Sequence, residues 1–244
     1  MASDVYICNA ALANLGDAAT LMSIDPPDGS LQAENCARFY PMARDALLEM
    51  HDWSFATKRV LLAQLAIDVP SQWTYAYAAP NDMLNVIALL DGAGVDDASE
   101  PLLTSVTYPA FPIPIGAGGS MVYPMMPQMG IYALQPFTLE CTDGGQDVIY
   151  TNQANAELRF VARVIDTTKF SPLFTSTLEA LLTSKLAGPI LKGEAGMQAA
   201  IRWEGITFGA DGKSGRFGRA IASDAGNKRT SVRDRQQVSW IVGR

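Results

Sequence analysis

The segment "VIYTNQANAELRFVARVIDTTKFSPLF", residues 148–174, holds an apolar run, a polar turn, a second apolar run and an abrupt helix start. The two apolar runs, "VIYT" and "AELRFVARVI", favour strands because they are short, β-branched and bounded by turn residues. Ser171 is a suitable N-cap and Pro172 suits the first helical position. The segment therefore predicts a junction at which β structure gives way to a helix.

The sequence before this junction predicts a β module. "FTLEC" (137–141) and "QDVIYT" (146–151) flank "TDGGQ", a strong hairpin signal. Further strand regions are predicted in "FATKRVLLAQLAI" (55–67) and "NVIALLDGAG" (85–94). Between Pro101 and Pro136 lie seven of the fourteen prolines and four of the ten methionines, so an extended or loop insertion is expected there.

Helices are predicted at both ends of the chain. Residues 3–15 and 31–50 carry apolar stripes at helical spacing, and so do "PLFTSTLEALLTSKLAGPIL" (172–191) and residues 194–207. The two N-terminal (front) helices cannot bury their apolar stripes alone, and neither can the two C-terminal (back) helices. The front and back helices are therefore expected to pack together.

The predicted fold class is α+β, a helical bundle with an inserted antiparallel β module and an extended C-terminal tail. The bundle takes residues 1–54 and 169–209, the β module takes 55–168 with a Pro- and Met-rich loop at about 92–136, and a basic, flexible tail takes 210–244.

Charge is unevenly distributed along the chain. The formal net charge is -7, but residues 210–244 hold eight basic residues against three acidic ones, about +5, which leaves about -12 elsewhere. The acidic body argues against general binding of nucleic acid or anionic membranes. The tail could bind phosphate, or it could dock on a protein partner with Trp240 and Ile241 as terminal anchors.

The cysteines and the N-terminus indicate the cellular compartment in which the protein is expected. Cys8, Cys36 and Cys141 are odd in number, widely spaced and in apolar contexts, which predicts buried free thiols in a reducing compartment. The N-terminus lacks a basic n-region and no apolar run approaches the length of a membrane span, so neither secretion nor membrane insertion is expected.

Candidate chemistry is sparse. His51 is the single histidine, so a zinc site built on histidines is excluded by count, and a nucleophilic site of the Cys/His/Asp kind would have to use it. The alternative is a helix-end histidine that serves local structure. "GADGKSG" (209–215) resembles a phosphate loop, but Thr207 stands where the first glycine should be and a helix precedes it, which favours a flexible linker.

An acidic turn offers oxygen ligands for a hard cation. It contains Asp91, Asp96, Asp97 and Glu100, whose spacing does not match the twelve-residue calcium loop, so an acidic surface turn is the preferred interpretation. No catalytic residue, cofactor or metal site is predicted.

The order of several motifs resembles the head-to-tail adaptor (connector) family of tailed phages. The motifs are "NAALANLGD" (9–17), "AENCARFYPMARDALLEMHDWSFATKR" (33–59), "WTYAYAAPNDMLNV" (73–86) and the segment from 148 to 191. The nearest branch looks like the tail tubular protein A type of short-tailed phages. The resemblance covers about residues 3–205 apart from the loop at 92–136.

This resemblance implies a structural, non-enzymatic virion protein. Such adaptors form a ring, typically twelve-fold, beneath the portal protein, extend the DNA channel and support the downstream tail or nozzle protein. The implied location is the neck of the virion, after assembly in the host cytoplasm, without a membrane. Genomic DNA would pass without sequence-specific binding, because an acidic wall repels phosphate.

The resemblance also suggests contact residues. C-terminal segments of such adaptors reach the portal, which makes Arg229, Arg233, Arg235, Trp240 and Ile241 the candidates on the tail.

Two further pairs of residues are candidate contacts. Met125 and Met126 lie in the long loop, which departs from the shorter family pattern and could meet the nozzle or a neighbouring protomer. Arg159 and Arg163 are predicted to share a strand face, where they either pair with acidic residues of a neighbour or form a solvated surface.

Two other functions stay open. One is a nucleic-acid-binding assembly factor that acts through the basic tail. The other is a hydrolase that uses His51 or the acidic turn.

Overall fold

A computed structural model describes residues 3–18, 20–91, 135–142, 144–212 and 214–233, with side chains described up to residue 226 apart from Asp91. The described chain contains five α-helices, one short 3-10 helix and six strands. It divides into two compact units. The helical unit comprises Met1–Arg59, Pro80–Ile87 and Arg159–Arg244, and the strand unit comprises Val60–Ala79 and Ala88–Leu158. The observed fold is α+β, as predicted.

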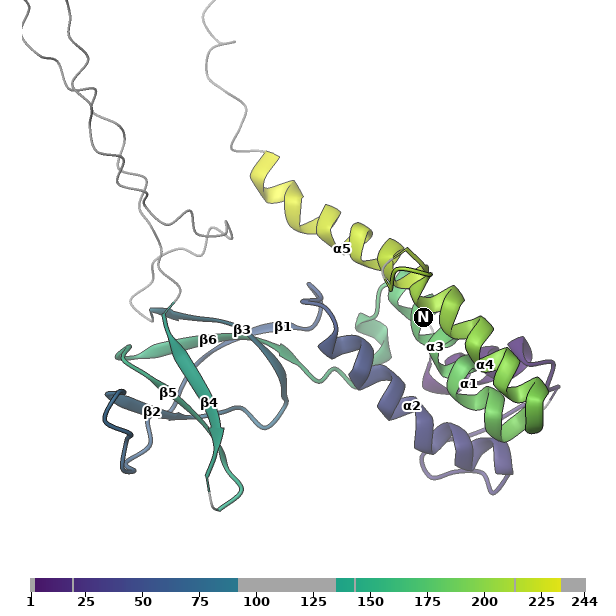
Figure 1. The fold of residues 1–244 in the computed structure, drawn as a ribbon, viewed down its shortest axis with the longest axis horizontal. Helices are drawn as coiled ribbons and strands as arrows, with labels where there is room; N and C mark the ends of the chain where they lie inside the picture. The colour runs from purple at the N-terminus through teal and green to yellow at the C-terminus, as the bar shows by residue number, and fades with distance from the viewer. Residues whose placement is uncertain (1–2, 19, 92–134, 143, 213, 234–244) are drawn as a thin grey trace, which may run out of the picture. The chain divides into compact units, whose positions relative to one another are not determined.

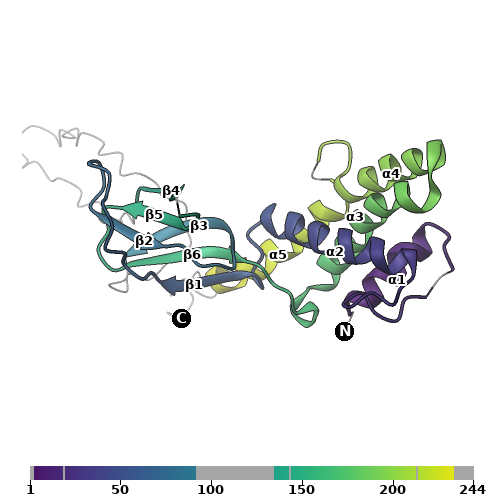
Figure 2. The same ribbon diagram turned by 90° about the horizontal axis from the view of Figure 1, so that it is seen from below.

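The helical unit is built around helix α3. Helix α3 contacts all four other helices, and Figures 1 and 2 both show it between α2 and α4. The predicted packing of front helices against back helices is therefore confirmed. The helices are α1 (Asp4–Asn14), α2 (Leu31–Glu49), α3 (Pro172–Leu191), α4 (Gly193–Phe208) and α5 (Arg216–Arg233).

Serine side chains cap the first three of these helices. The hydroxyl of Ser3 accepts a hydrogen bond from the Tyr6 N–H (3.1 Å), and Ser30 does the same for Ala33 (3.1 Å). Ser171 accepts from the Phe174 N–H at 3.2 Å, and Pro172 occupies the first turn of α3. The helix start predicted from the segment at 148–174 is therefore confirmed.

The core of the helical unit is centred on Trp53. This side chain is fully buried, its indole N–H donates to the Leu47 carbonyl (2.8 Å), and its ring meets Phe174 edge-on at 5.0 Å. Phe55 and Phe170 extend the aromatic cluster. Because Phe170 and Phe174 flank the start of α3, burying these rings fixes the start of this helix in the core of the helical unit.

The six strands form two three-stranded antiparallel sheets. In one, β6 (Ala156–Ala162) lies between β1 (Thr57–Leu61) and β3 (Met83–Asp91). In the other, β5 (Asp147–Thr151) lies between β2 (Tyr75–Ala78) and β4 (Phe137–Cys141). Strands β1, β3 and β6 each run from one compact unit into the other.

The hairpin predicted around "TDGGQ" is confirmed. Strands β4 and β5 pair with Cys141 opposite Asp147, and the Thr142 carbonyl accepts a hydrogen bond from the Gly145 N–H at 2.8 Å. Gly145 has a φ of 76°, which favours glycine. The other predicted strands are shorter than expected, since β1 ends at Leu61 and β6 ends at Ala162. Strand β2 was not predicted as a separate element.

The junction between β6 and α3 is organised by a 3-10 turn. The turn, Thr167–Lys169, follows Asp166, whose carboxylate accepts hydrogen bonds from the backbone N–H (3.0 Å) and hydroxyl (2.7 Å) of Thr168. The hydroxyl bond, followed by the backbone bond, lowers the pKa of Asp166 below its usual range. Two capped turns in succession thus separate strand from helix.

The predicted extended and flexible tail was wrong for its first part. The described residues 209–212 and 214–215 belong to a close turn, and α5 then runs from Arg216 to Arg233. A Cβ on Gly215 would lie 2.4 Å from the Thr207 carbonyl oxygen, so only glycine fits there. Phe217, Ala220 and Asp224 are buried at helical spacing, and α5 contacts α3 and α4. This short stripe was obscured in the sequence by the surrounding Gly, Ser and charged residues.

Candidate functional site

The single histidine lies in a polar cluster that holds α5 in place. The Asp224 carboxylate on α5 lies 3.2 Å from the His51 Nε2 and accepts hydrogen bonds from the Ser54 N–H (3.1 Å) and hydroxyl (2.5 Å). Asp224 is 6% exposed, and the His51 ring meets Trp53 edge-on at 4.9 Å. The cluster joins the segment after α2 to the C-terminal helix.

The order of contacts in this cluster does not suit nucleophilic catalysis. An activated serine donates its proton to an imidazole, which a carboxylate then orients from the other side. Here the carboxylate is in the middle, and the Ser54 hydroxyl donates to Asp224. The geometry matches the alternative from the sequence, a histidine at a helix end that serves local structure.

The predicted pair of arginines is not a shared strand face. Arg159 lies within β6 and is half-buried, whereas Arg163 follows the end of the strand. The Arg163 guanidinium Nε lies 3.0 Å from the Asp45 carboxylate on α2, and its backbone N–H donates to the Asp82 carbonyl (2.7 Å). The ion pair of Arg163 is thus made within its own chain, because β6 ends three residues earlier than predicted.

Asp45 also forms an ion pair with a buried arginine. The Arg44 guanidinium, 7% exposed as a residue, lies 2.8 Å from the same carboxylate. One carboxylate thus compensates two guanidinium groups, and this small network fixes the segment after β6 to the C-terminal third of α2.

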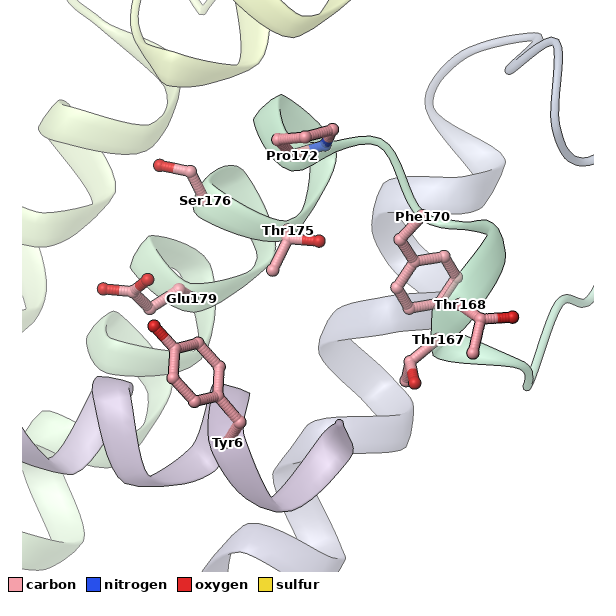
Figure 3. Close-up of a pocket in the computed structure, with 8 residues that line it drawn as sticks. All are labelled: Tyr6, Thr167, Thr168, Phe170, Pro172, Thr175, Ser176 and Glu179. Carbon is pink, nitrogen blue, oxygen red and sulfur yellow. The ribbon is translucent and has the colours of Figure 1, made fainter. Parts of the chain in front are cut away.

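A pocket of about 350 Å³ lies where the 3-10 turn meets α1 and α3. Figure 3 shows Tyr6 and Glu179 together on one side, with Thr167, Thr168 and Phe170 on the other. Glu179 accepts a hydrogen bond from the Asn14 side chain at 2.7 Å. The other lining residues are Pro172, Thr175 and Ser176.

The chemistry of this pocket suits binding better than catalysis. Its polar groups are hydroxyls and one carboxylate, without an imidazole or thiol to act as base or nucleophile among the lining residues. Such a lining could accept a polar or cationic side chain of a partner. This pocket was not predicted from the sequence, because its residues come from three separate elements.

A second pocket, of about 280 Å³, lies beside the middle of α2. Its lining includes Asp4, Asp25, Tyr40 and Arg44. The Tyr40 hydroxyl is buried without a hydrogen-bond partner, and burial raises the pKa of this group above its usual range. This pocket was also not predicted.

The three cysteines differ in exposure. Cys8 on α1 and Cys36 on α2 are buried as predicted, but Cys141 at the end of β4 is exposed, which corrects the prediction for that residue. A hydrogen bond between Cys8 and Cys36 raises the pKa of Cys8, to which burial adds, and lowers that of Cys36. The position of Cys141 on an outer strand of its sheet accounts for its exposure.

For the remaining predicted contact residues, side-chain positions are not described. Arg229 and Arg233 belong to α5, of which only the backbone is described after residue 226. Those outside the described residues are Met125, Met126, Arg235, Trp240 and Ile241, together with Asp96, Asp97 and Glu100 of the acidic turn.

Across the described ranges, no three His, Cys, Asp or Glu side chains are grouped so that they could hold a metal ion. In the same part of the chain, no helix is both long and apolar enough to span a membrane.

Comparisons with known proteins give no match: no protein-family model matches the chain, and neither does any curated protein sequence.

Proposed function

We propose that this protein is a structural head-to-tail adaptor of a tailed phage, which forms a ring beneath the portal protein and attaches the downstream tail or nozzle protein. The observation that supports this most is helix α5. Its first half is fixed to the helical unit through Phe217, Ala220 and Asp224, and the helix then continues to Arg233. A C-terminal helix whose first half is buried against the helical unit and whose second half is basic is well suited to contact a second protein.

The charge of the chain supports the same role. The second half of α5 and the residues after it contribute Lys228, Arg229, Arg233, Arg235 and Arg244 to a chain whose net charge is -7. Basic groups concentrated at one end can pair with acidic groups on a portal, while an acidic body repels the phosphates of passing DNA. In this proposal the ring is twelve-fold, and DNA passes through it without sequence-specific binding.

The proposal is tested with the full-length protein and the portal of the same phage. Native mass spectrometry and electron microscopy are applied to the protein alone and to the mixture. We expect a monomer or weak oligomer alone and a closed ring only with the portal. A protein that remains monomeric in the mixture and does not bind the portal would overturn the proposal.

A truncation tests the role of the tail separately. Removal of residues 234–244 leaves α5 and its buried anchors intact. We expect this variant to keep the circular dichroism spectrum and melting temperature of the full chain but to lose portal binding. If the truncated chain binds the portal as tightly as the full chain, contacts other than the terminal segment carry the docking.

A second candidate function is favoured by the same basic helix, namely nucleic-acid binding during assembly. Its signature is an affinity for DNA that falls steeply with salt, because each phosphate contact releases a counterion. Neutralising Arg229, Arg233 and Arg235 should then reduce the salt slope by roughly one per phosphate contact removed. Absence of DNA binding at low salt would exclude this function.

A further inference from the structure

Helix α4 presents an apolar stripe away from the helix it packs on. Its buried residues among those described are Gly196 and Thr207, and the Cα of Gly196 approaches the backbone of α3 so closely that a Cβ would lie 2.8 Å from the Ala187 carbonyl oxygen. By contrast, Met197 is 59% and Ile201 is 65% exposed. These two are neighbours at i and i+4, so they form a continuous apolar surface.

Charged and polar groups border this stripe. Glu194 lies two turns before Ile201 along the same side, and its carboxylate accepts a hydrogen bond from the Gln198 side chain at 3.0 Å. We call these four residues, Glu194, Met197, Gln198 and Ile201, the α4 face.

Helix α2 carries a surface of matching composition. Leu31 and Met42 are 59% and 57% exposed, and Glu34 and Arg38 are exposed between them. Their spacings of three, four and four residues place all four on one side of the helix. We call these four residues the α2 face.

The two faces belong to opposite sides of the helical unit. Helices α2 and α4 each pack on α3, and α3 lies between them in both ribbon views. A contact between the α4 face of one copy and the α2 face of another therefore leaves one free face on each copy. Contacts of this heterologous kind continue from copy to copy and close into a ring when the rotation allows.

Both faces have the same residue spacing when the helices run antiparallel. If Arg38 lies opposite Glu194, the equal rise per residue of the two helices places Leu31 opposite Ile201 and Glu34 opposite Gln198. Met42 lies beyond the start of α4 in this register, and Met197 lies opposite position 35, between Glu34 and Arg38. Arg38 thus meets Glu194, Glu34 meets Gln198, and the exposed side chain of Leu31 meets that of Ile201.

We propose that the α2 face and the α4 face are the two halves of the contact between neighbouring copies of this chain, antiparallel and with Arg38 paired to Glu194. This inference rests on the proposed function, to which it adds the interface. A contact of about two helical turns buries on the order of several hundred Å², below the roughly 1,200 Å² of stable complexes. The contact is therefore weak alone and forms when a template brings copies together.

The test is a charge exchange in the full-length chain. Arg38→Glu and Glu194→Arg each place like charges at the interface, and the double variant restores the pair in reverse. Lys169→Glu, which reverses an exposed charge on the 3-10 turn, is the matched control. The readouts are sedimentation of the protein alone at high concentration and the ring formed with the portal.

We expect each single variant to weaken self-association at least about tenfold, with the double variant and the control close to the original protein. A fold check by circular dichroism accompanies each variant, and recovery in the double variant excludes misfolding as the cause. If the original chain forms rings on the portal and both single variants do so equally well, the interface is wrong but the adaptor function stands. If the original chain neither self-associates nor forms rings, both are overturned.

Discussion

Substitution of Asp224 by alanine should release α5 from the helical unit without unfolding the rest of the chain. The carboxylate accepts hydrogen bonds from the N–H and hydroxyl of Ser54 and lies 3.2 Å from the His51 ring. Both partners belong to the segment after α2, about 170 positions away in the sequence. Helix α5 makes these contacts, and the packing of Trp53 against Leu47 and Phe174 does not depend on them.

The size of the effect follows from the nature of the contacts. A hydrogen bond to a charged group contributes about 1.5–3 kcal/mol net, and several bonds to one carboxylate are not independent. Loss of the carboxylate also leaves the Ser54 N–H without this acceptor. We expect the docking of α5 to weaken by about 3 kcal/mol, which corresponds to roughly a hundredfold in the local opening equilibrium.

Hydrogen exchange measured by mass spectrometry can detect this opening directly. The amides of α5 in Asp224→Ala should exchange about a hundredfold faster than in the original protein, while those of α3 keep their rates. Ser223→Ala, which changes an exposed neighbour on the same helix, is the control and should have no effect. Unchanged exchange in α5 of the Asp224 variant would show that the polar cluster does not hold the helix.

Three further predictions concern other parts of the chain. With a thiol reagent, Cys141 should react rapidly and the two buried cysteines only after unfolding, since one cysteine is exposed and two are not. Gly215→Ala should destabilise the turn before α5 by about 2 kcal/mol or more, because the new Cβ would meet backbone atoms, whereas Gly188→Ala in α3 has free space and should be neutral or slightly stabilising. Hydrogen bonds from the Met22 N–H and from Ser30 lower the pKa of Asp28 to about 2, so the stability that this group adds is fully present above its ordinary pKa of 3.8 and is lost as the pH falls through 2. Asp28→Asn should therefore lower the melting temperature at pH 7 and reduce its decline between pH 4 and 2.

The parts of the fold that depend on nearby residues were predicted well. The starts of α1 and α3 follow from serine caps that bond to the third residue beyond, and the β4–β5 hairpin follows from a turn closed over a few positions. The apolar stripes of these helices also indicated that front and back helices pack together. All these signals lie within a few residues of the feature they determine.

The candidate site was predicted less completely. The role of His51 in local structure was one of two alternatives in the sequence, and only the position of Asp224 distinguishes them. The ion pair between Arg163 and Asp45 was not foreseen, because no short-range pattern connects a residue after β6 with the C-terminal third of α2. Both pockets combine residues from separate elements and were missed for the same reason.

The sequence by itself determined the α+β class, the ends of most helices and the uneven charge, since periodicity, capping and composition are properties of short segments. Only the tertiary structure decided that a tail rich in glycine and charge contains a docked helix. Asp224 contributes to this docking through contacts with residues some 170 positions away, and Phe217 and Ala220 contribute by burial in the core. A local pattern carries no information about partners so distant.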